Sequence, residues 1–171
     1  MNPALRTAAA LLLAAAPAAA SPVLAPDGAL RIAPVALSPG PPNGDLSAGL
    51  EGWSVEGRDP PLLLGPGARL AANATLVSPP LALPAGSQTL RVALRAPGGA
   101  GLVLVRARVE DGSETDLGAL EPGAARRSWP VGVAALAGRT VRIVIDPVPA
   151  LGTTVDLLRV GPVTEIGRAH V

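Results

Sequence analysis

The sequence contains no cysteine, lysine, phenylalanine or tyrosine, and only one histidine, His170. Without cysteine there is no disulfide and no thiolate ligand for a metal ion. A catalytic triad needs a base beside its nucleophile, and the only imidazole, that of His170, lies in a segment that we interpret below as non-native. No glycine-rich phosphate loop opens a helix, so the sequence gives no support to a nucleotide-dependent activity.

A pair of carboxylates that cleaves glycosidic bonds is the remaining hydrolytic chemistry. We expect the acidic side chains available for it to lie mostly in loops and turns, where solvated acids are ordinary. Aromatic residues make up only 1% of the chain, so little is left to line a sugar subsite. The acidic candidates are Glu51, Glu56, Asp59, Glu110, Glu114, Asp116 and Glu121. The sequence therefore predicts that the protein is not an enzyme.

Residues 1–20 have the three parts of an export signal. Arg6 supplies the positive charge, residues 8–16 form an apolar run, and alanines at 18–20 provide a small-residue cleavage site before Ser21. The apolar run is shorter than the roughly 20 residues that span a bilayer, and no later stretch could span one. We expect a cleaved signal peptide and a secreted, periplasmic or cell-envelope protein. An uncleaved N-terminal anchor is the alternative.

The remaining chain divides by composition. Residues 21–42, rich in proline, alanine and serine, are predicted to form a linker or an extended lead-in to a single domain at 43–165. We interpret residues 166–171 as a non-native tail, because this string matches one translation of a common sequencing adapter. The natural chain would then continue beyond Glu165, and His170 would have no role.

All 14 basic residues are arginine, which is typical of a GC-rich genome. Removing Arg6 with the signal peptide and Arg168 with the tail leaves 12 arginines against 13 acidic residues, a net charge of about −1. This balance gives no electrostatic reason to expect nucleic acid as a partner.

Apolar residues alternate with polar ones in several short segments, which predicts strands at 89–95, 102–109, 141–146 and 155–160. Asp111-Gly112 is a turn signal between two strands, and Leu30 to Ile32 could form a short edge strand. No segment after residue 20 has helical periodicity over three turns. Short strands spaced roughly ten residues apart favour an all-β, β-sandwich fold.

Residues 43–53 resemble the opening of carbohydrate-binding modules that have the galactose-binding-like jelly roll. The chain reads Asn-Gly-Asp-Leu and then Gly-Leu-Glu-Gly-Trp, where the family pattern is approximately N-G-D-F-E, a short gap and G-W. Three further stretches match the family in the correct order, at 78–86, 136–143 and 155–160. The resemblance spans residues 43–163. It implies a jelly-roll β-sandwich that binds carbohydrate without catalysis.

The family often holds a structural calcium ion near its first and last strands, and this chain keeps only part of the ligand set. Asp45 and Asp156 remain as candidate ligands, whereas Ser47 and Leu157 replace acidic residues of the pattern. Calcium prefers six to eight oxygen ligands. The alternative is that Asp45 caps a turn and Asp156 accepts local hydrogen bonds. No other cofactor is expected.

Family members usually stack sugars on aromatic side chains, and this chain has two tryptophans. Trp53 belongs to the Gly-Trp motif, which the family usually buries, so we expect it in the core. Trp129 precedes Pro130 and is open to two interpretations: it packs in the sandwich or it contacts a ligand from an exposed loop.

Arginine is the more distinctive feature, because Arg91, Arg95, Arg106, Arg108 and Arg142 all occupy the phase opposite the apolar residues of their strands. If those strands lie side by side, they present a face rich in guanidinium groups. Such groups bind carboxylate or sulfate bidentately, so we hypothesise an acidic polysaccharide or another cell-envelope polymer as the ligand. The alternative is a solvated face on which these arginines pair with Glu110, Glu114 and Asp116.

The sequence therefore predicts a secreted, non-catalytic β-sandwich module that binds carbohydrate, with an acidic glycan favoured. A structural or adhesion-type protein is the alternative, with exposed leucines at 62–64 contacting a protein partner. A third interpretation is the N-terminal fragment of a longer exported protein.

Overall fold

The computed structural model describes residues 23–24, 30–31, 39–149 and 154–162. The predicted signal peptide, most of the predicted lead-in and the predicted tail lie outside the described residues. Residues 1–34 and 35–171 form two separate units. In the first, β1 (Val23–Leu24) pairs antiparallel with β2 (Leu30–Arg31), which confirms the strand expected at Leu30 and Arg31.

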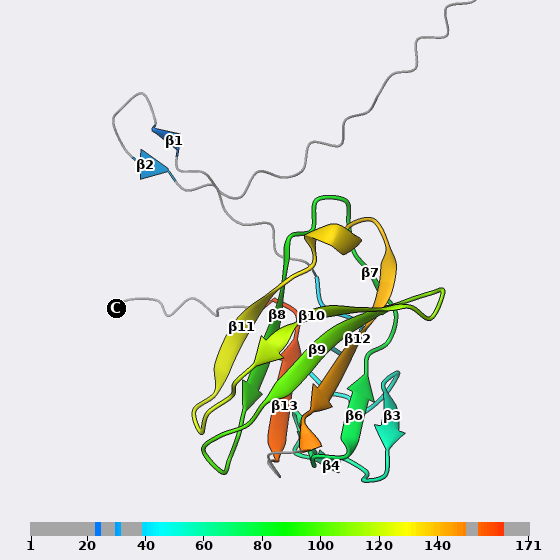
Figure 1. Cartoon of the computed structure of the whole chain (residues 1–171), viewed down its shortest axis with the longest axis vertical. Coiled ribbons are helices and arrows are strands. Elements are labelled where there is room, and N and C mark those ends of the chain that lie inside the picture. The colour runs from blue at the N-terminus through cyan, green and yellow to red at the C-terminus, as the bar shows by residue number, and fades with distance from the viewer. Residues whose placement is uncertain (1–22, 25–29, 32–38, 150–153, 163–171) are drawn as a thin grey trace, which may run out of the picture. The chain divides into compact units, whose positions relative to one another are not determined.

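The second unit consists of two antiparallel sheets, shown in Figure 1. The first is a six-stranded sheet in the order β10-β9-β12-β6-β3, with β7 also paired to β12. Its strands are β3 (Ser54–Gly57), β6 (Ala74–Val77), β7 (Leu81–Ala82), β9 (Val103–Val109), β10 (Glu114–Leu120) and β12 (Thr140–Pro147). The second is a five-stranded sheet in the order β11-β8-β13-β5-β4. Its strands are β4 (Leu62–Leu63), β5 (Ala68–Leu70), β8 (Thr89–Arg95), β11 (Arg127–Gly132) and β13 (Val155–Val160).

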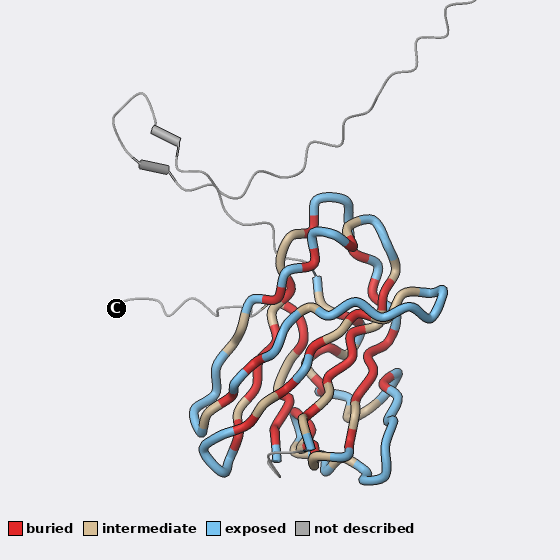
Figure 2. The backbone as a smooth tube through the Cα atoms, viewed as in Figure 1, coloured by how far each residue is buried: buried red, intermediate tan, exposed pale blue. Residues whose placement is uncertain are grey.

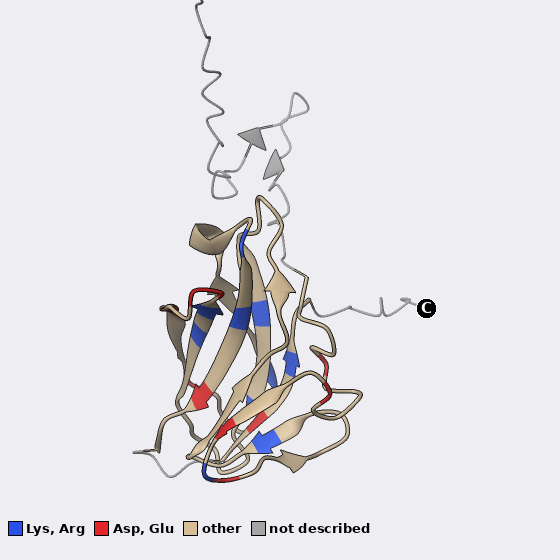
Figure 3. Ribbon diagram, turned by 90° about the vertical axis from the view of Figure 1, so that its right-hand side faces the viewer, with Lys and Arg blue, Asp and Glu red and all other residues tan. Residues whose placement is uncertain are grey.

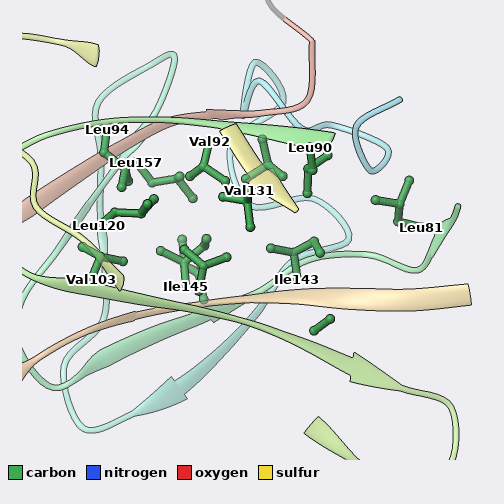
Figure 4. Close-up of a cluster of buried hydrophobic side chains, with 14 of the residues drawn as sticks. Leu81, Leu90, Val92, Leu94, Val103, Leu120, Val131, Ile143, Ile145 and Leu157 are labelled. Atoms are coloured by element: carbon green, nitrogen blue, oxygen red, sulfur yellow. The ribbon is translucent and has the colours of Figure 1, made fainter. Parts of the chain in front are cut away.

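One apolar core fills the space between the sheets, as Figure 4 shows. Leu90, Val92 and Leu94 of β8 point toward Ile143 and Ile145 of β12, and all five are fully buried. Alternate residues of each strand supply the core, because successive side chains of a strand point to opposite faces. Figure 2 shows the exposed segments in the loops and on β3, β4 and β10, and the buried ones mainly on the other strands. The predicted all-β sandwich is therefore confirmed.

The four strands predicted from alternation are all present, and β8 and β13 have the predicted bounds. The Asp111-Gly112 turn connects β9 to β10, with Gly112 in the left-handed region at φ 84°. A short 3-10 turn, η1 (Ala134–Leu136), lies between β11 and β12. None of the described helices is long and apolar enough to cross a membrane.

The loop that carries the Asn-Gly-Asp-Leu motif is held by the side chain of Asn43. Its amide donates to the carbonyls of Gly49 and Glu51, at 3.1 Å each, and its carbonyl accepts from the Ala48 backbone at 3.0 Å. The indole of Trp53 donates to the Asn43 backbone carbonyl at 3.0 Å. Trp53 is only 7% exposed, so its predicted place in the core is confirmed. This motif therefore shapes the first loop.

Candidate functional site

The outer face of the six-stranded sheet brings three of the sequence-predicted arginines together. Strands β9 and β12 are neighbours, with Arg108 opposite Arg142 and Arg106 opposite Val144. Because directly paired residues share a face, Arg106, Arg108 and Arg142 all point away from the core. Figure 3 shows basic and acidic residues as bands on adjacent strands of the sandwich.

Arg108 is the centre of a charged network on this face. Its two terminal amino groups donate to the carboxylate of Glu56 on β3, at 2.7 and 3.0 Å, and its Nε donates to Glu114 on β10 at 2.9 Å. The hydrogen bond from Arg108 lowers the pKa of Glu56 below its ordinary value, although burial opposes the shift. The same contacts raise the pKa of Arg108. The network therefore links the strand at one edge of the sheet, β3, to β10 at the other.

Arg106 extends this network along the sheet. It donates to Glu114 at 2.9 Å and to Asp146, and Asp146 also accepts from the hydroxyl of Thr75 at 2.9 Å. Between these side chains lie Val77 and Val144, which are on the same outer face yet only 1% and 0% exposed. The charged side chains that span these strands thus cover an apolar strip.

Two hollows lie at opposite ends of this face. One, of about 350 Å³, is lined by Pro80, Arg108, Glu110 and Arg142, and the guanidinium of Arg142 is held by a hydrogen bond to the Ser78 carbonyl at 3.1 Å. The other, of about 290 Å³, is lined by residues that include Arg58, Asn73, Thr75 and Asp146. Each hollow offers both hydrogen-bond donors and acceptors, as a polyhydroxylated ligand requires.

The expected single arginine face is wrong, because Arg91 and Arg95 belong to the other sheet. They lie on β8, whose neighbours are β11 and β13, whereas β9 pairs with β10 and β12. Residues 96–102 connect β8 to β9 by crossing from one sheet to the other, so the outer faces of these strands point in opposite directions. The alternation of apolar and polar residues predicts which side chains of a strand point outward. It does not predict which strands are neighbours in a sheet.

The alternative interpretation, in which these arginines pair with nearby acidic residues on a solvated face, is correct for part of the network. Glu114 pairs with Arg106 and Arg108, as that alternative expected. Glu110 and Asp116 form no ion pair with any residue of the described chain. Glu56 and Asp146 take part instead, and sequence reasoning missed both roles because these residues lie on strands far from β9 in the chain.

Trp129 lies on the core side of the five-stranded sheet. It is paired with Val92 and packs against the core cluster while remaining half-buried. Of its two interpretations, packing in the sandwich is the one that the structure shows. The outward-pointing side chains of the described strands therefore include no aromatic ring.

Asp45 and Asp156, the candidate calcium ligands, make protein contacts with their carboxylates. Both oxygens of the fully buried Asp156 side chain accept hydrogen bonds, from Nε of Arg69 and of Arg95 at 2.7 Å each and from Nη2 of Arg69 at 3.1 Å. Asp45 accepts from the hydroxyl and backbone N–H of Ser47 at 2.9 and 3.2 Å. No cluster of three or more potential metal ligands exists among the described residues. The calcium site stays a prediction, and the alternative set of local hydrogen bonds is what the structure contains.

Glu56 on the six-stranded sheet is poorly suited to act as the general acid of a glycosidase. Glu56, Glu114 and Asp116 lie on strands, whereas the other four candidates lie in loops and turns, as expected for most of this set: Glu51, Asp59, Glu110 and Glu121. A glycosidase needs one carboxyl with a raised pKa as its general acid. The pKa of Glu56 is instead lowered by the hydrogen bond from Arg108. The contact from Arg108 therefore stabilises the Glu56 carboxylate in its charged form.

Comparison with solved structures identifies the fold. A variant of a family 29 carbohydrate-binding module, solved with mannohexaose, superposes with a TM-score of 0.53 at 12% identity, over 72% of this chain and 86% of its own. Another, solved with cellulohexaose, gives a TM-score of 0.50 at 13% identity, over 64% of this chain and 78% of its own. This chain has the fold of a carbohydrate-binding module. No family model matches the sequence, and no curated protein does.

Proposed function

We propose that this protein is a non-catalytic module, exported from the cell, that binds a polysaccharide on the outer face of the six-stranded sheet. The single observation that carries the proposal is the charged face that runs between two hollows, on a fold shared with modules solved in complex with mannohexaose and cellulohexaose. The fold alone does not specify a ligand, so the side chains on this face must supply the argument.

The charge of this face favours a neutral glycan. Arg106, Arg108 and Arg142 are matched by Glu56, Glu114, Asp116 and Asp146, so the face has no excess of positive charge. Sugar hydroxyls both donate and accept hydrogen bonds, which suits paired guanidinium and carboxylate groups. Aromatic stacking contributes much of the energy in many sugar sites, and its absence here predicts weak binding, with Kd in the millimolar range.

Replacing Arg142 with Ala is expected to weaken binding of mannohexaose about tenfold, because the hollow beside Pro80 loses a charged donor. The measurement is a calorimetric titration of the full chain with mannohexaose and with cellohexaose. Arg91→Ala is the matched control, since it removes the same side chain from the opposite sheet and should leave the affinity unchanged. No binding of either oligosaccharide, or equal losses in both variants, would overturn the proposal.

A protein-binding role is the second candidate, and it has one specific observation in its favour. Leu62 and Leu63 on the edge strand β4 are 60% and 53% exposed, which fits the sequence expectation of an apolar contact surface there. An edge strand also offers unpaired backbone groups to a partner. The test is to change both leucines to Ser and to measure glycan binding again. Unchanged glycan binding would show that this edge and the sugar-binding face act separately.

A further inference from the structure

The outer face of the five-stranded sheet carries an excess of positive charge. Its outward-pointing residues include four arginines, Arg69, Arg91, Arg95 and Arg159, on the neighbouring strands β8, β13 and β5. We call this set the arginine face. The only acidic side chain among them is Asp156, which is paired across the sheet with both Arg69 and Arg95. On the strands of this face, one carboxylate therefore lies among four guanidinium groups, and the loop residue Asp45 forms a long ion pair with Arg159 at 3.9 Å.

Asp156 accepts hydrogen bonds from only some of the N–H groups of Arg69 and Arg95. Arg95 donates to it through Nε alone, so its two terminal amino groups have no partner among the described residues. Arg69 donates through Nε and Nη2 and keeps Nη1. These side chains are 43% and 34% exposed, so the remaining donors are accessible to a ligand. The carboxylate thus fixes both guanidinium groups in place and leaves the unpaired N–H groups available.

Arg91 and Arg159 complete the face. The guanidinium of Arg91 forms neither a hydrogen bond nor an ion pair within the described chain. Arg159 donates to the Pro162 carbonyl at 3.1 Å and forms a long ion pair with Asp45 of the first loop, at 3.9 Å. Arg159 is opposite Ala93 on β8, so it lies between the levels of Arg91 and Arg95 on the sheet. The four arginines therefore form one continuous patch.

We propose that the arginine face is a second binding surface, separate from the neutral-glycan face, and that it takes an acidic polysaccharide. Guanidinium groups bind carboxylate and sulfate bidentately, and a polymer presents such groups repeatedly, so that several arginines engage one chain at once. Arg91 and Arg95 are four residues apart on one strand, about 13 Å, which a polymer can span and a single small anion cannot. A neutral sugar gains little here, because the outward-pointing residues on the described strands of this sheet offer its hydroxyls no free carboxylate acceptor: both oxygens of Asp156 are occupied by Arg69 and Arg95.

The sequence hypothesis of an acidic glycan is thereby assigned to two of the five arginines that it named. Arg91 and Arg95 belong to the arginine face, together with Arg69 and Arg159, which sequence reasoning did not include. The β-bulge at Leu158 explains the omission of Arg159, because it shifts the alternation of β13 by one residue. On the six-stranded sheet Arg106 and Arg108 are paired with carboxylates of that same sheet, and Arg142 donates to the Ser78 carbonyl.

The test is affinity electrophoresis of the full chain through gels that contain polygalacturonate, dextran sulfate, single-stranded DNA or neutral glucomannan. We expect retardation by polygalacturonate and dextran sulfate at low salt that falls steeply as salt is added. Arg91→Ala should weaken it about tenfold, the loss of one charge-assisted bidentate contact. Arg91→Lys keeps the charge without the planar fork and should recover only part of the affinity. Arg91 is the residue to change because it supports no other side chain in the described structure.

The opposite-face variant Arg142→Ala is the matched control, and it should retain full retardation by both acidic polymers. The absence of retardation at low salt, equal losses in Arg91→Ala and Arg142→Ala, or tighter binding of DNA than of either polysaccharide would each overturn the inference. The neutral-glycan proposal fails on different data, namely the oligosaccharide titrations and the response to Arg142→Ala, so the two can fail independently.

Discussion

Replacing Gly44 with Ala is expected to lower the free energy of unfolding by about 3 kcal/mol, because the new methyl group would collide with backbone atoms. A Cβ at this position would lie 2.2 Å from the carbonyl oxygen of Val160 and 2.9 Å from that of Pro41. The Gly44 carbonyl also accepts the Val160 N–H at 2.7 Å, so the loop cannot move away without losing this bond to β13. Glycine is required at this position because there is no room for a side chain between the loop and β13.

Urea unfolding followed by tryptophan fluorescence would measure this effect, since Trp53 is buried and hydrogen-bonded to the neighbouring Asn43. Gly132→Ala is the matched control, because a Cβ at Gly132 on β11 meets no atom within 4 Å. That variant should be as stable as the parent or slightly more stable, through a less flexible unfolded chain. A Gly44→Ala variant within 0.5 kcal/mol of the parent, a shift typical of neutral surface changes, would contradict the close approach of the loop to β13.

The longer strands with a buried face could be predicted from the sequence, whereas most of the exposed or short ones could not. In β8 and β12 the residues Leu90, Val92 and Ile143 alternate with polar ones and are fully buried, so the period of two is clear. Strand β10 is almost entirely exposed, so its sequence lacks a buried apolar face. Strand β11 contains Pro130, and a proline argues against predicting a strand because it cannot donate a backbone hydrogen bond to a neighbouring strand. Both lie at sheet edges, where proline and charge are tolerated. Their existence follows from pairing with a neighbour, which a local pattern does not encode.

The sequence predicted which arginines point outward from their strands. It did not predict which of them lie together on the same sheet. Alternation placed each arginine on the outside of its strand correctly, since cross-strand pairing puts Arg91 and Arg108 away from the core. Which arginines meet depends on strand order, which depends in turn on the connection between β8 and β9. The ion pair between Arg108 and Glu56 joins residues 52 positions apart, and no spacing in the sequence indicates it. The same holds for the placement of Asp156 between two arginines.

An Asp156→Asn variant, which removes the negative charge of this side chain, is expected to lower the free energy of unfolding by about 2 kcal/mol at neutral pH. Desolvation by burial works to raise the pKa of this carboxyl, but hydrogen bonds and attraction from Arg69 and Arg95 outweigh it, and the net shift is downward. Asparagine is neutral and retains one acceptor oxygen, so the charge-assisted part of the contact is lost. Both arginines are partly exposed and regain water in the variant, which keeps the cost below that of breaking a fully buried ion pair.

The pH dependence separates a charge effect at Asp156 from a packing effect. Because its folded-state pKa lies below the ordinary value of 3.8, Asp156 stabilises the fold fully above that value, and the contribution is lost as the pH falls through the lowered folded-state pKa. The difference in stability between parent and Asp156→Asn should therefore be constant from pH 7 to about pH 5 and shrink below about pH 4. Asp116→Asn on β10 is the matched control, since Asp116 is exposed and unpaired within the described residues, and it should leave the profile unchanged. A difference that stays constant down to pH 2 would attribute the loss to packing, and the arginine face would then not depend on a buried anion to order it.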